Sequence, residues 1–255
     1  MGAALAGGLL AAAWASADDI AVVEPVATRR DALARELPGV TVAPSLDDVA
    51  GVADAVVAVK PADVPAAAGA LAAAGARRVL SIAAGVSTAT LETALAPGTV
   101  VVRAMPNTPA LVGQAASAIA PGRHATETDL EWAAGILGSV GIVVRVPEYQ
   151  LDAVTGLSGS GPAYVFLVAE ALIDAGVLVG LPREVSRQLT VQLLVGSATL
   201  LASSDQSAEQ LRGGVTSPGG TTAAGLHVLE RAGLRAALMD AVVAATERSR
   251  ELGAA

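Results

Sequence analysis

Short aliphatic runs alternate with helical stretches from the start of the chain to Arg145. The run Ala55–Val59 is continuous and rich in valine, as expected for a strand that is buried on both faces. Strands that alternate with helices imply a parallel sheet covered by helices on both sides. The pattern therefore predicts a doubly wound α/β domain.

The predicted strands of this domain span Ile20–Val23, Val40–Val42, Ala55–Val59, Val79–Ile82, Val100–Ala104, Ala115–Ile119 and Ile142–Arg145. The predicted helices span Met1–Ala17, Thr28–Leu37, Leu46–Val52, Val64–Ala74, Ser87–Leu95 and Thr128–Val140. Ligands of such sheets bind beyond the carboxyl ends of the strands. The sequence places there Glu24, Lys60–Pro61, Ala83–Gly85 and Met105–Asn107.

From Gln150 onward the strand signals vanish and helical periodicity replaces them. We predict helices over Leu151–Leu157, Ala163–Val179, Pro182–Ala202, Ser207–Arg212, Ala223–Arg231 and Leu234–Leu252, with a break at Ser158–Pro162. The predicted domains are therefore residues 1–147, which would bind a dinucleotide, and residues 148–255, which would be all-helical. The helix over Ala163–Val179 is apolar nearly all round and must be buried on most sides, which predicts a partner subunit.

Charge and composition exclude several functions. The formal net charge of −8 argues against binding nucleic acid or an anionic membrane through bulk charge. The chain has no cysteine, which excludes disulfides and thiolate metal sites and is compatible with a cytoplasmic location; we expect no metal site. The apolar stretch Met1–Ala17 resembles a signal peptide but lacks a basic residue near its start, so we predict a buried helix. No other run is expected to span a membrane.

The stretch Val215–Thr222 predicts a tight turn that opens into a helix. Pro218 fixes one backbone angle, and the glycines that follow it allow the chain to fold back. Such a turn leaves backbone N–H groups pointing outward at the positive end of a helix dipole, where a carboxylate can bind. An ordinary capped loop between two helices is the alternative.

The beginning of the sequence departs from the usual order of a dinucleotide-binding fold, which opens with a strand and a glycine-rich turn ahead of the first helix. Here Met1-Gly2 leads directly into the helix. A missing central strand would leave two rows of backbone groups unpaired. We therefore expect the sequence to be truncated at its start; upstream coding DNA with an in-frame strand and Gly-x-Gly would support this, and an immediate stop codon would contradict it.

Four motifs in order identify a resemblance. They are Ala58-Val59-Lys60-Pro61, Arg103-Ala104-Met105-Pro106-Asn107-Thr108-Pro109, Leu157-Ser158-Gly159-Ser160-Gly161-Pro162-Ala163-Tyr164, and Val215–Thr222 with Leu226–Glu230. Through them the chain resembles the pyrroline-5-carboxylate reductase family over nearly its whole length. The resemblance implies reduction of 1-pyrroline-5-carboxylate to L-proline by NADPH or NADH. It also implies an N-terminal Rossmann domain and a helical domain that forms a homodimer, with dimers often assembled into a decamer.

The resemblance also implies the site residues. The cofactor would be bound by Met1, Gly2, Glu24, Ala58, Val59, Lys60, Pro61, Ala83, Ala84, Gly85 and Asn107. The substrate would be bound by Ser217, Gly219, Gly220, Thr221 and Thr222, with backbone N–H groups on its carboxylate and the Thr222 hydroxyl, the expected catalytic group, near the ring nitrogen. Glu24 favours NADH, whereas Arg29 or Arg30 would suit NADPH, and the family implies a slight preference for NADPH.

Two other functions compete with this one. Related dehydrogenases of the β-hydroxyacid type carry a catalytic lysine on a helix of their second domain, and this chain has no lysine after Gln150. A reductase remnant that lost its cofactor loop and serves as a binding or assembly protein is the other alternative. Hydrolase chemistry at Ser158–Gly161 is rejected because no strand precedes that serine-glycine run.

Overall fold

The computed structural model describes residues 1–254, which form two compact units. The first unit comprises Met1–Ser160 together with the C-terminal segment from Val243 onward, and the second comprises Gly161–Val242. The units therefore divide at different positions from the predicted domains, whose boundary near Pro147 remains a prediction. Each unit is described by itself.

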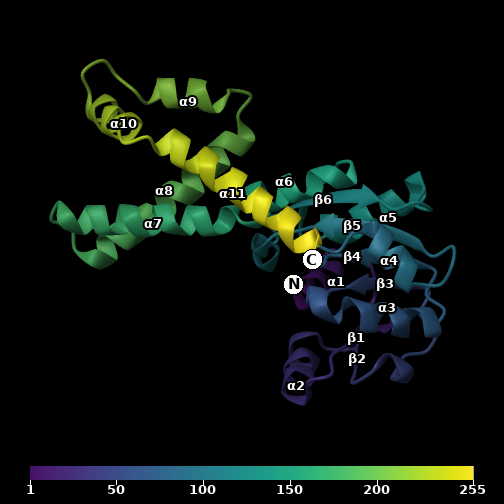
Figure 1. Ribbon diagram of the computed structural model, residues 1–255. Coiled ribbons are helices and arrows are strands. Elements are labelled where there is room, and N and C mark those ends of the chain that lie inside the picture. The colour runs from purple at the N-terminus through teal and green to yellow at the C-terminus, as the bar shows by residue number, and fades with distance from the viewer. Residues whose placement is uncertain (255) are drawn as a thin grey trace. The chain divides into compact units, whose positions relative to one another are not determined.

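The first unit alternates strands and helices, as predicted (Figure 1). Its strands are β1 (Ala21–Val23), β2 (Thr41–Ala43), β3 (Asp54–Val57), β4 (Arg78–Ser81), β5 (Val100–Met105), β6 (Ala115–Pro121) and β7 (Gly141–Arg145). Its helices are α1 (Gly2–Ala11), α2 (Ala27–Glu36), α3 (Val64–Ala73), α4 (Thr88–Ala94), α5 (Glu127–Gly138), α6 (Leu151–Val154) and the end of α11 (Leu234–Ala254).

The strands form two separate sheets. β1 pairs in parallel with β2, and the larger sheet has the order β3-β4-β5-β6-β7. Among the described residues no strand pairs with the other edge of β1 or of β3. Helix α1 packs against both sheets, because Leu5 and Leu9 belong to the core of the larger sheet while Ala6 belongs to the cluster around β1 and β2. The expected α/β fold is confirmed, and its strands are divided between two sheets.

One strand pair differs from the prediction of a wholly parallel sheet. β6 runs antiparallel to β5, with Val102 opposite Pro121 and Met105 opposite Ala118. The connection between these strands holds a short 3₁₀ turn, Thr108–Val112, and no crossover helix. A parallel pair needs a crossover of a dozen or more residues, so this short connection favours the antiparallel arrangement.

The core lies on both faces of the larger sheet, because neighbouring strand residues point to opposite sides. On one face Val79 and Val101 pack against α3 and α4. On the other face Leu80 and Val102 pack against α1 and α5. All four valine and leucine side chains are fully buried, as the continuous aliphatic runs predict.

Three local predictions were wrong. Helix α1 ends at Ala11 instead of Ala17, because Ala13 turns into a positive φ of 51°. The predicted helix Leu46–Val52 is a single 3₁₀ turn, Leu46–Asp48. The predicted break at Ser158–Pro162 is instead a π-helical turn, Thr155–Gly159, that leads directly into α7 (Gly161–Leu178).

The second unit consists of α7, α8 (Arg183–Ser203), α9 (Ala208–Gly214), α10 (Thr221–Arg231) and the first part of α11. Many of its large apolar side chains are exposed; on α7 these include Val165, Phe166 and Leu167. By length and composition alone, the helical stretch Glu148–Leu178 could cross a membrane, which the prediction from sequence had excluded. A helix that is buried between subunits can have the same length and apolar composition.

Candidate functional site

The predicted cofactor residues that follow β3, β4 and β5 lie at one edge of the larger sheet, because these three strands run parallel. Ala58, Val59, Lys60 and Pro61 follow β3 and are exposed. Ala83, Ala84 and Gly85 follow β4 and form a loop, here called the β4–α4 loop, in which Gly85 has a φ of +75°. That backbone angle favours glycine.

The start of α1 lies beside the same edge. A Cβ atom added to Gly2 would approach the Ala58 side chain to 3.1 Å, so the helix backbone comes close to the end of β3. Met1 is the N-cap of α1, no side chain caps the helix, and its first turn contains no acidic residue. The first backbone N–H groups of α1 therefore form a positively polarised end at which an anion can bind.

Glu24 and Arg30 meet at the carboxyl end of β1. The Glu24 carboxylate accepts a hydrogen bond from the Val26 N–H at 2.9 Å. The Arg30 Nη1 atom donates to the carbonyl oxygens of Glu24 at 3.0 Å and Pro25 at 2.7 Å. One guanidinium nitrogen is thereby held in place, while the group's remaining N–H donors stay available for a phosphate.

Asn107 has a structural role that the sequence did not reveal. Its Nδ2 atom donates to the Ser158 carbonyl at 3.0 Å, and its Oδ1 atom accepts from the Ala116 N–H at 2.9 Å. The buried side chain thus connects the end of β5 to β6 and to the π-helical turn. Any contact with a cofactor would have to use the remaining hydrogen-bonding capacity of the amide.

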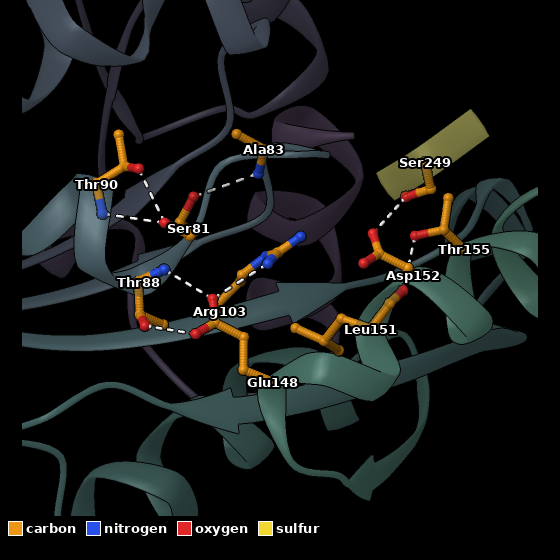
Figure 2. Close-up of polar contacts among 11 residues, drawn as sticks. Ser81, Ala83, Thr88, Thr90, Arg103, Glu148, Leu151, Asp152, Thr155 and Ser249 are labelled. Carbon is orange, nitrogen blue, oxygen red and sulfur yellow. Dashed lines mark hydrogen bonds and ion pairs between the residues drawn. The ribbon is translucent and has the colours of Figure 1, made fainter. Parts of the chain in front are cut away.

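A partly buried ion pair between Arg103 and Glu148 lies beside the start of α4 (Figure 2). The residue Arg103 on β5 is 9% exposed, and its Nη1 atom donates to Glu148 Oε1 at 3.1 Å. The Thr88 N–H and hydroxyl each donate to the Glu148 carboxylate at 2.7 Å, so Glu148 holds the first residue of α4. Burial raises the pKa of Glu148, but these hydrogen bonds and the charge of Arg103 outweigh it and leave the pKa below its usual value of 4.5.

This ion pair was not predicted from the sequence. The available signal was Arg103 itself, a charge inside the otherwise aliphatic strand Val100–Ala104. A buried charge needs a partner, but the partner lies 45 residues further along the chain. Spacing in the sequence could not have identified Glu148.

We expect Glu148→Gln to destabilise the protein at pH 7 by about 1–3 kcal/mol, because the buried Arg103 loses its carboxylate partner. Folding lowers the pKa of Glu148, so its stabilisation is complete above about pH 4.5 and is lost as the pH falls through the lowered value. Urea unfolding of both proteins from pH 7 to pH 3 would measure this. The matched control is Glu131→Gln on the exposed side of α5; equal effects of the two substitutions would contradict the prediction.

The predicted substrate residues form a turn in the second unit. The Gly220 N–H donates to the Ser217 carbonyl at 3.1 Å, and Gly219 has a φ of +69°. Gly220 is the N-cap of α10, and no side chain caps the helix or places an acidic group in its first turn. The turn therefore presents uncapped backbone N–H groups beside the half-buried Thr222 side chain, an arrangement that suits a small carboxylate.

Comparison with known proteins shows that the chain is similar to pyrroline-5-carboxylate reductases. A family model described as pyrroline-5-carboxylate reductase dimerisation matches residues 148–252. The pyrroline-5-carboxylate reductase of Synechocystis is 44% identical over 99% of this chain and 95% of its own length. That of Mycobacterium tuberculosis is 45% identical over 99% of this chain and 93% of its own.

Solved structures agree with these relatives. A pyrroline-5-carboxylate reductase from Coxiella burnetii superimposes with a TM-score of 0.90 at 34% identity, covering 98% of this chain and 93% of its own. The Plasmodium falciparum pyrroline carboxylate reductase, solved with NADP bound, gives a TM-score of 0.87 at 33% identity, covering 99% and 94%. The likeness extends through both compact units.

Proposed function

Because the chain belongs to the pyrroline-5-carboxylate reductase family, we propose that it reduces 1-pyrroline-5-carboxylate to L-proline, the last step of proline biosynthesis. The proposed site residues are those at the edge of the larger sheet, which bind the cofactor, and those of the turn Ser217–Thr222, which bind the substrate. The enzyme is an oxidoreductase that acts on a cyclic imine with NAD(P)H. The observation that carries this conclusion is the identity of 44% that extends over nearly the whole chain. The uncapped turn Ser217–Thr222 and the small-residue edge of the larger sheet support the assignment of its site.

The residues at the sheet edge fit a dinucleotide. The uncapped start of α1 at Met1 and Gly2 suits the pyrophosphate, because backbone N–H groups and the helix dipole favour an anion there. The small side chains of Ala83, Ala84 and Gly85 allow a flat ring or a ribose to approach the backbone. Ala58–Pro61 and the remaining capacity of Asn107 complete the proposed cofactor residues.

The preference between NADPH and NADH depends on residues that follow β1. Arg30, oriented by two carbonyl groups, suits the 2′-phosphate of NADPH, while the Glu24 carboxylate is engaged by the Val26 N–H. A carboxylate that is held in this way is less available to the ribose of NADH. We therefore propose NADPH as the preferred cofactor, with NADH also used.

The bound cofactor supplies the hydride, so the protein's task is positioning and electrostatics. In the proposed site, the N–H groups of Gly219, Thr221 and Thr222 bind the substrate carboxylate, and the Ser217 hydroxyl adds a contact. The Gly220 N–H was also expected to bind the carboxylate, but it donates to the Ser217 carbonyl and so holds the turn in shape. The Thr222 hydroxyl donates a hydrogen bond to the neutral imine nitrogen or passes it a proton, which the hydroxyl regains from solvent. A protonated imine accepts a hydride more readily, which is why a hydroxyl at that nitrogen matters.

Removing this hydroxyl gives a direct prediction. Thr222→Ala is expected to lower kcat by about tenfold to a hundredfold while the Kd for NADPH stays the same, because only the imine loses a contact. Thr221→Ala is the control, since its backbone N–H group and not its side chain is used. Steady-state kinetics would decide; an unchanged kcat in Thr222→Ala would remove the hydroxyl from the mechanism.

The chain forms an oligomer of its own copies, in agreement with the family match to a dimerisation domain. We propose that the unit is a homodimer; further assembly into a decamer, a location in the cytoplasm and the absence of membrane and nucleic-acid binding remain predictions. The competing dehydrogenase reading is disfavoured because no lysine follows Gln150. The relatives likewise favour an active reductase over a non-catalytic remnant.

The proposed activity is tested by following NADPH oxidation at neutral pH with and without 1-pyrroline-5-carboxylate. Oxidation that depends on this imine supports the proposal. Binding of NADPH without any turnover of the imine would favour the remnant instead. Running the same assay with NADH gives the ratio of kcat/KM for the two cofactors and so tests the role assigned to Arg30.

A further inference from the structure

The last turn of α11 contacts the β4–α4 loop backbone to backbone. A Cβ atom added to Gly253 would lie 3.1 Å from the Gly85 carbonyl oxygen. A Cβ atom on Gly85 would lie 3.7 Å from the Leu252 carbonyl group and from the Gly253 nitrogen. The two glycines therefore permit a closer approach of helix and loop than residues with side chains would.

The end of α11 is fixed in this position by polar contacts within the first unit. The Ser249 hydroxyl donates to Asp152 Oδ1 at 2.7 Å, which joins α11 to α6 (Figure 2). Ser249 and Thr246 are both buried, although polar side chains usually lie at the surface. The turn that contacts Gly85 is thus the end of an anchored helix and not a loose tail.

The β4–α4 loop is held at its other end as well. Glu148 binds the N–H and hydroxyl groups of Thr88, the first residue of α4. Glu148 and Asp152 lie four positions apart, in the short 3₁₀ turn Glu148–Gln150 and in α6, which follows it directly. One short segment therefore supports both the helix that begins after the loop and the helix that rests on Gly85.

We propose that the last turn of α11, with Gly253 in contact with Gly85, is a positioning element that sets the conformation of the β4–α4 loop for binding the nicotinamide half of the cofactor. This inference rests on the proposed function, which assigns the loop to the cofactor. Gly253 touches neither cofactor nor substrate in this account; it acts through Gly85. A side chain at position 253 pushes the loop away and weakens cofactor binding.

The experiment compares Gly253→Ala and Gly253→Val with the wild type by titrating NADPH fluorescence in the absence of substrate. We expect the Kd for NADPH to rise about twofold in Gly253→Ala and about tenfold in Gly253→Val, since small displacements of positioning groups have large effects. Alanine is a better helix former than glycine, so the melting temperature of Gly253→Ala stays the same or rises. Weaker binding without lower stability is a result that a merely structural role would not give.

Gly69→Ala is the matched control, because Gly69 also lies in a helix of the first unit and a Cβ atom there meets nothing within 4 Å. It should change neither the Kd for NADPH nor the KM for the imine. An unchanged Kd in Gly253→Val would overturn the inference.

Hydrogen exchange of the wild type separates this failure from a failure of the proposed function. Protection of the amides of residues 83–87 by NADPH supports the placement of the cofactor at the loop. If that protection is present and Gly253→Val binds NADPH normally, only the role of α11 is overturned. If NADPH binds without protecting these amides, the placement of the cofactor and the inference are both overturned.

Discussion

Gly220→Val is expected to reduce kcat/KM for 1-pyrroline-5-carboxylate by about a hundredfold or more, because it displaces the backbone N–H groups that are proposed to bind the carboxylate. A Cβ atom at position 220 would lie 2.3 Å from the Ser217 hydroxyl oxygen and 3.2 Å from the Ser217 carbonyl oxygen. The Ser217 hydroxyl must therefore rotate away and the Ser217 carbonyl must shift, and the two γ-methyl groups of valine add to the crowding in the turn. The φ of Gly220 is −78°, which valine adopts easily, so the effect arises from the clash and not from backbone strain.

Steady-state kinetics with both substrates would measure this effect. The Kd for NADPH should stay within about twofold of the wild type, because the cofactor residues lie in the other compact unit. Gly225→Ala in α10 is the control, since a Cβ atom there meets nothing within 4 Å. Removing the Ser217 hydroxyl relieves the contact at 2.3 Å, so Gly220→Ala should reduce activity less in a Ser217→Ala background than in the wild type. A Gly220→Val enzyme with normal KM for the imine would contradict the assignment of the turn Ser217–Thr222 as the substrate-binding site.

Phe166→Asp is expected to convert the enzyme into an inactive monomer. Phe166 lies on α7, is 64% exposed in the single chain, and has exposed apolar neighbours at Val165 and Leu167. A dimer interface would bury this surface, and an unpaired carboxylate there costs several kcal/mol by the usual penalty for a buried charge. Size-exclusion chromatography with activity measured across the peak would test both parts of the prediction.

Phe166→Leu is the matched control, because it keeps an apolar side chain at the same position and should preserve both the dimer and its activity. Circular dichroism would establish that the Phe166→Asp protein remains helical. A helical monomer with full activity would contradict the requirement for a partner subunit. A Phe166→Asp protein that elutes as a dimer would place the interface elsewhere.

The alternation of strands and helices could be predicted because buried parallel strands must be aliphatic along their whole length. Val79, Leu80, Val101 and Val102 illustrate this, since neighbouring residues fill opposite faces of the sheet. The direction of β6 could not be predicted in the same way. It depends on a connection too short to carry a crossover helix, and aliphatic runs do not record strand direction.

The candidate site was predictable where backbone geometry determines it. The turn at Ser217–Thr222 follows from proline and glycine, and Gly85 adopts the positive φ that glycine permits. Contacts between residues distant in sequence were not predictable. Asn107 is hydrogen-bonded to Ser158 and Ala116, Arg103 is paired with Glu148, and Gly253 is packed against Gly85. Each of these contacts forms only when the chain folds.

Isotope transfer from the cofactor to the product shows whether the enzyme reduces the imine. The enzyme is incubated with 1-pyrroline-5-carboxylate and NADPH that carries deuterium at both C4 positions, and the amino-acid product is analysed by mass spectrometry. We expect L-proline that carries a single deuterium on the former imine carbon, formed in equal amount to the NADPH consumed. Oxidation of NADPH without proline, or proline without deuterium, would contradict it.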